Sequence, residues 1–196
     1  MAILNNYIVY LSFCMLFALG CNAQEKQGRD LPSIYKAYKK DNSVKNKRDF
    51  FYAFPTSFVG LQQLYGYDDI KGTAAKYYNV APEHISLFFK SAENIDNKVF
   101  TKKVLDISKN GKWEADAVNY FQDGLRKYFF NHSNTFLELL SKRDKNEISG
   151  FWYFFSDGPH FNKEVSNRVL KLLKSNPSME RTYLNAVQKV KKDNAH

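Results

Sequence analysis

Three residues that could form a nucleophilic catalytic set lie close together in one loop of the sequence. Ser156, Asp157 and His160 surround a Gly-Pro pair, and Ser, Asp and His are the side chains of acyl-transfer triads. Ser, Asp, Gly and Pro are also the residues that a turn needs. We therefore interpret this run as a turn and assign no catalytic residue to the chain. His160 remains a candidate binding residue, with helix capping or packing as the alternative.

Carboxylates and histidines offer two further chemistries. Asp116 and Asp123 are seven residues apart, so one helix face would carry both, as an acid and base acting on a polymer would require. Solvent-side acids explain this spacing more simply. No His belongs to an H-E-x-x-H motif or a Cys/His cluster, and no glycine-rich phosphate loop or G-x-S-x-G elbow is present. The sequence therefore predicts neither a metal site nor a cofactor. The four histidines are His84, His132, His160 and His196.

Aromatic side chains are the remaining candidates for binding. Rings at helical spacing are typical of a core, although Tyr and Trp also suit interfaces because they carry a polar group. Trp113 follows Gly111 in an expected loop, so we expect it to be the most exposed of these rings. We take Trp113 and Trp152, together with His160, as the candidate binding residues.

A run of five aromatic residues, Phe151–Phe155, should form the centre of the core. Ile148, Phe151, Trp152 and Phe155 follow one another at helical spacing, and the run lacks the alternation of a strand. The following Asp-Gly-Pro stops a helix, because Gly accepts the left-handed cap and Pro cannot continue the helix. We predict a buried helix that ends near Asp157.

The same patterns recur along the chain and predict an all-α fold. We expect about nine or ten short helices in an irregular bundle or a short solenoid-like stack, because no region alternates over a useful length. Helices are expected to begin at Ser43, Asp96, Asn162 and Asn176. Four further local expectations are specific: an inward-facing Val44, a cap at Thr56, a helix starting at Asp68-Asp69 and running towards Tyr77-Tyr78, and a capping box formed by Thr135 and Glu138.

The first part of the chain is an apolar segment typical of an export signal. Met1–Gly20 contains no charged residue and is followed by the polar stretch Asn22–Asp30. We therefore divide the chain into a signal peptide (1–20), a polar tether (21–31) and one helical domain (32–193). An uncleaved membrane anchor is the alternative, because the segment is long and lacks a preceding Lys or Arg.

Ala18-Leu19-Gly20-Cys21 resembles the lipobox of bacterial lipoproteins. The resemblance implies cleavage before Cys21, lipidation of that Cys, and attachment to a membrane. Asn22 stands where Asp would imply retention in the inner membrane, so the resemblance favours an outer-membrane protein facing the periplasm. Cleavage after Ala23 is the alternative and would give a secreted or periplasmic soluble protein. The body contains no Cys, so its apolar core must hold it together without disulfides.

The formal net charge of +9 suggests an acidic protein, an anionic lipid or a nucleic acid as partner. The predicted envelope location disfavours nucleic acid. We therefore hypothesise a non-catalytic envelope lipoprotein that binds a partner protein, for example as an immunity protein or inhibitor. An enzyme acting on an envelope polymer and a basic protein that binds the membrane surface are the alternatives.

Overall fold

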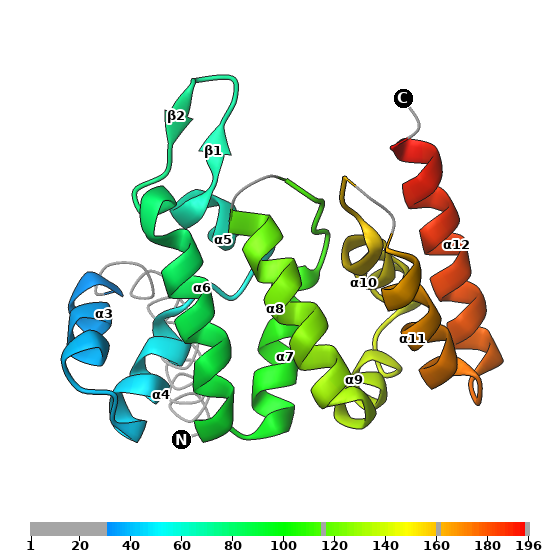
Figure 1. The fold of residues 1–196 in the computed structure, drawn as a ribbon, viewed down its shortest axis with the longest axis horizontal. Helices are drawn as coiled ribbons and strands as arrows, with labels where there is room; N and C mark the ends of the chain where they lie inside the picture. The colour runs from blue at the N-terminus through cyan, green and yellow to red at the C-terminus, as the bar shows by residue number, and fades with distance from the viewer. Residues whose placement is uncertain (1–30, 115–116, 160–161, 195–196) are drawn as a thin grey trace, which may run out of the picture. The chain divides into compact units, whose positions relative to one another are not determined.

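The computed structural model describes residues 31–114, 117–159 and 162–194 of the chain, and this part is all-α (Figure 1). It contains ten α-helices, which confirms the predicted fold class and number of helices. The signal peptide, Cys21, Asp116, His160 and His196 lie outside the described residues. The elements are α3 Leu31–Lys40, α4 Val44–Ala53, α5 Phe58–Tyr65, β1 Tyr67–Asp68, β2 Thr73–Ala74, η1 Tyr78–Val80, α6 Ala81–Lys90, η2 Ser91–Asn94, α7 Asn97–Ser108, α8 Ala117–Asn131, α9 Ser133–Leu140, α10 Lys145–Ser156, α11 Lys163–Leu173 and α12 Pro177–Asp193.

The chain divides into two compact units, Met1–Phe54 and Pro55–His196. In the described part of the first unit, α3 and α4 pack together, with the Tyr38 ring edge-on to Phe50 at 5.7 Å. Val44 was predicted to face inward, but it is 57% exposed at the first position of α4. The single domain expected over residues 32–193 stays a prediction, because compactness alone does not show whether a unit folds independently.

The aromatic helix α10 lies in the core of the second unit, as predicted. Phe151, Trp152, Phe154 and Phe155 are all buried. Around them, α8 contributes Phe129, whose ring lies 5.1 Å from that of Phe155, and α12 packs along α10. Buried aromatic pairs at such distances add to the free energy gained by removing the rings from water.

Side-chain caps begin most of the helices, and several are those that the sequence predicts. Two predicted caps are wrong. Ser57, and not Thr56, caps α5 by accepting a hydrogen bond from the Gly60 amide. Thr135 and Glu138 lie inside α9, where Glu138 forms an ion pair with Lys142 instead of closing a capping box. The confirmed caps are Ser43, Asp96, Asn162 and Asn176.

The segment expected to be a helix from Asp68-Asp69 is the β1–β2 hairpin. Tyr67 pairs with Ala74, and Asp68 pairs with Thr73. Asp68 Oδ1 accepts hydrogen bonds from the amides of Ile70 and Lys71, each at 3.1 Å. The chain then turns back because Gly72 takes a left-handed conformation, with φ of 63°.

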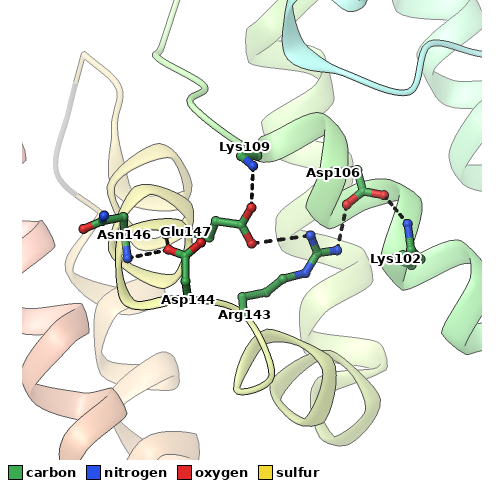
Figure 2. Close-up of polar contacts among 7 residues, drawn as sticks. All are labelled: Lys102, Asp106, Lys109, Arg143, Asp144, Asn146 and Glu147. Carbon is green, nitrogen blue, oxygen red and sulfur yellow. Dashed lines mark hydrogen bonds and ion pairs between the residues drawn. The ribbon is translucent and has the colours of Figure 1, made fainter.

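An ion-pair network joins α7 to the start of α10 (Figure 2). Arg143 lies at its centre and pairs with Asp106 at 2.7 Å and with Glu147 at 3.6 Å. Lys102 and Lys109 complete the network by pairing with Asp106 and Glu147, respectively. The carboxylate of Glu147 raises the pKa of the Lys109 ammonium by accepting a hydrogen bond from it. Networks of this kind contribute more to stability than isolated surface pairs do.

Candidate functional site

The loop after α10 brings together several of the residues that the sequence singled out. Asp157 Oδ2 accepts a hydrogen bond from the Trp113 amide at 2.7 Å, and Oδ1 accepts one from the Gly158 amide. Ser156 Oγ is buried. Both oxygens of the Asp157 carboxylate are therefore engaged in holding the loop. His160, the third member of the set, lies outside the described residues.

Two polar side chains of α8 cover the carboxyl end of α10. Arg126 donates through Nη2 to the carbonyl oxygens of Phe155 and Asp157, at 3.0 and 3.1 Å. Gln122 donates through Nε2 to the carbonyl oxygens of Phe154 and Asp157. The carboxyl end of a helix carries a partial negative charge and unpaired carbonyl groups, so a guanidinium interacts favourably there. Burial lowers the pKa of Arg126. This polar cluster therefore supplies hydrogen-bond donors to the carbonyl groups at the carboxyl end of α10.

The two tryptophans lie in different environments. Trp113 is half-buried, with its indole beside Gly158, and so it is less exposed than we expected. Trp152 is completely buried and donates its indole N–H to Met179 Sδ at 3.2 Å. A partner could contact Trp152 only if the surrounding helices opened.

The most exposed apolar side chain of the described residues is Ile70, at the tip of the β1–β2 hairpin. It is 98% exposed. The turn that carries Ile70 is well defined, because Asp68 accepts hydrogen bonds from two backbone amides and forms an ion pair with Lys71 at 3.2 Å. Hydrogen bonds from Lys71 also lower the pKa of Asp68. The hairpin extends beyond the ends of α5 and α6 (Figure 1), so Ile70 is presented on a projecting arm.

A cavity of about 540 Å³ lies against this hairpin. The end of α5, both strands and the loop before α8 line it. Among the described residues, the lining contains three acids, Asp68, Asp69 and Glu114, and no lysine or arginine. Glu114 Oε1 accepts a hydrogen bond from Gln62 Nε2 at 2.6 Å. The cavity is therefore negatively charged, although the chain as a whole carries +9.

Exposed apolar side chains gather around this cavity. Val59, Tyr67 and Ile70 account for three of the eight large apolar residues that are exposed in the described part of the chain. Val59 does not line the cavity, but it lies about one helical turn before Gln62 and Gln63 of α5, which do. We call this region the hairpin surface; it consists of Val59, Gln62, Gln63, Tyr67, Asp69, Ile70 and Glu114.

The sequence analysis did not identify the hairpin surface. The available signal was Ile70 itself, a lone apolar residue within Asp-Asp-Ile-Lys-Gly. The two acids before it and the Gly two residues after it are residue types that favour a turn.

A second cavity, of about 520 Å³, lies between α6, α7 and α8. Gly124 lines it, and a Cβ at that position would meet the Phe89 ring. His132 lines it and lies against Tyr128, with ring centroids 4.4 Å apart. No group of three His, Cys, Asp or Glu side chains among the described residues is arranged to hold a metal ion.

Comparisons with known proteins give no match to a family model, to a curated protein or to a solved structure. In the described part of the chain, no helix combines the length and the apolar character needed to span a bilayer. The arguments about function therefore depend on this chain's own residues.

Proposed function

We propose that this protein is a non-catalytic lipoprotein of the bacterial envelope that binds a partner protein through the hairpin surface. The observation that supports binding is Ile70, an isoleucine held almost fully in water by a hydrogen-bonded turn. Interfaces obtain most of their binding energy from a few side chains that enter pockets of the partner. A projecting apolar side chain with Tyr67 and Val59 nearby fits that role.

The proposed location is the outer membrane, on the periplasmic side, with Cys21 as the lipidated first residue of the mature protein. The support is the lipobox-like run that ends at Cys21. Lipid chains contribute about 0.8 kcal/mol per buried methylene, so several chains give stable anchoring. The net charge of +9 would speed association with an acidic partner, and an immunity protein or inhibitor is one form of such a binder.

Intact-mass analysis of the mature protein from bacterial envelopes tests the anchor. We expect the chain to begin at Cys21 with the added mass of the lipid, and a Cys21→Ser variant to lose that mass and leave the membrane fraction. A mature chain that begins at Gln24 would contradict lipidation and indicate soluble export. A chain that retains Met1 would contradict cleavage.

Site-specific cross-linking tests the binding function. A photoreactive amino acid at position 70 should cross-link one defined envelope protein in living cells, whereas the same group at Leu184, an exposed residue of α12, should not. With that protein purified, Ile70→Asp should weaken binding by at least about tenfold, because a charge would replace an apolar anchor.

The matched control for affinity is Leu184→Asp, which should change binding less than about twofold, since rim and remote positions contribute little. Both variants change exposed positions and should keep the wild-type circular dichroism spectrum. Equal cross-linking from both positions, or affinity that does not change in Ile70→Asp, would contradict a partner site at the hairpin.

A further inference from the structure

The charge of the hairpin surface indicates what the partner presents to it. Resting on the function proposed above, we infer that the hairpin surface binds an extended segment of the partner that carries a lysine or arginine beside an apolar residue. The cationic group enters the cavity lined by Asp69 and Glu114, and the apolar residue packs on Ile70 and Tyr67.

Two acids of the cavity carry a charge that no described cation balances. Asp69 forms no ion pair with any described residue, and the partner of Glu114 is the neutral amide of Gln62. The carboxylate of Asp68, by contrast, is already used by the turn and by Lys71. Asp69 and Glu114 are therefore the two acids available to a ligand, and a cation restores the balance of charge.

The cavity combines acidic and apolar groups at one place. Lysine and arginine carry a long aliphatic stem below a charged head, so they bind where apolar surface leads to a carboxylate. Here Tyr67, 46% exposed, stands at the cavity, and Ile70 projects beside it. A purely apolar ligand would leave both carboxylates desolvated and unpaired, which costs free energy.

The same charge argues against the other classes of ligand. Anionic lipid headgroups and nucleic acid phosphates would be repelled by the three acids of the lining, whose described residues include no lysine or arginine. The partner can still be acidic overall. The partner's net negative charge would then be attracted at long range by the +9 of this chain. On contact, one cationic side chain of the partner would bind the cavity and fix the register of the complex.

Selection from a displayed library of random linear peptides tests this inference without knowledge of the partner. The target is the purified mature chain. We expect the enriched peptides to share a lysine or arginine next to an apolar residue. Asp69→Asn and Glu114→Gln should each weaken binding of a synthetic consensus peptide by about tenfold, and the double variant by more.

Glu164→Gln is the matched control, since Glu164 is an exposed acid in the first turn of α11, outside the hairpin surface. It should bind the consensus peptide as the wild type does. Replacing the cation of the peptide by glutamine should remove most of the difference between wild type and the double variant, because the interaction itself is then absent. Thermal unfolding of each variant shows that the fold is intact.

Three results would overturn the inference: no enrichment, a consensus without a cation, or binding that does not depend on Asp69 and Glu114. These results differ from a failure of the proposed function. A partner could cross-link to position 70 and bind Ile70→Asp more weakly than the wild type, but bind Asp69→Asn and Glu114→Gln as tightly as the wild type. That result would support the proposed function and contradict the inferred cationic ligand.

Discussion

Replacing Trp152 by alanine should lower the free energy of unfolding by about 3–5 kcal/mol, the usual cost of removing a large buried aromatic side chain. Trp152 is 0% exposed. Its ring lies 5.7 Å from Phe129 of α8 and 5.1 Å from Tyr183 of α12. One side chain thus links α10 to two other helices, and the surrounding structure should relax only partly into the space that alanine leaves. Urea unfolding followed by circular dichroism measures the change.

Two control variants separate core packing from other effects. Trp152→Phe keeps a ring but loses the N–H donated to Met179, so its cost should be smaller, about 1–2 kcal/mol. Tyr120→Ala removes an aromatic ring that is 45% exposed and should cost less than about 0.5 kcal/mol. A loss below about 1 kcal/mol for Trp152→Ala would contradict its place in the core and would favour a role at an interface.

The helices were predictable because their signals are local. Phe151 and Phe155 are one turn apart on the same helix, so their common burial follows from spacing alone. Asp96 and Asn176 accept hydrogen bonds from amides two or three residues ahead, and a cap of this kind needs nothing from the rest of the chain.

The hairpin was missed because Asp68 makes the same local bonds as a helix cap. Its Oδ1 accepts hydrogen bonds from the backbone amides two and three residues later in the chain, as Asp96 Oδ1 does. What differs is Gly72, whose left-handed backbone reverses the chain, and the pairing of Tyr67 with Ala74. Strands of two residues are too short to show alternation in the sequence.

The polar cluster at the end of α10 could be predicted only in part. The turn around Asp157 follows from its residue types, whereas the contact with Trp113 joins residues 44 apart in the chain. Arg126 and Phe155 are 29 residues apart. Nothing in the spacing of α8 distinguishes the half-buried Arg126 from the exposed Lys127 next to it, because the difference arises only when α8 packs on α10.

Acid should destabilise the protein through His84, by up to about 3 kcal/mol. This histidine of α6 is 1% exposed, and its Nδ1 lies 3.0 Å from the Tyr65 hydroxyl. Burial lowers its pKa from 6.5 to about 4, while the nearby Glu83 opposes the shift. Between these values the unfolded chain binds a proton that the folded chain does not bind. Stability is therefore complete above pH 6.5 and falls as the pH decreases towards 4.

Comparison with His84→Gln isolates this effect, since glutamine can still hydrogen-bond to Tyr65 but does not titrate. Other groups titrate equally in both proteins, so the quantity to measure is the difference in unfolding free energy between wild type and variant at several pH values. The unfolding free energy of the wild type, relative to that of His84→Gln, should decrease by about 2–3 kcal/mol as the pH falls from 7 to 4. By NMR, the His84 imidazole should stay neutral down to about pH 5. Parallel stability profiles, or an imidazole that titrates near 6.5, would show that burial does not hold His84 in its neutral form.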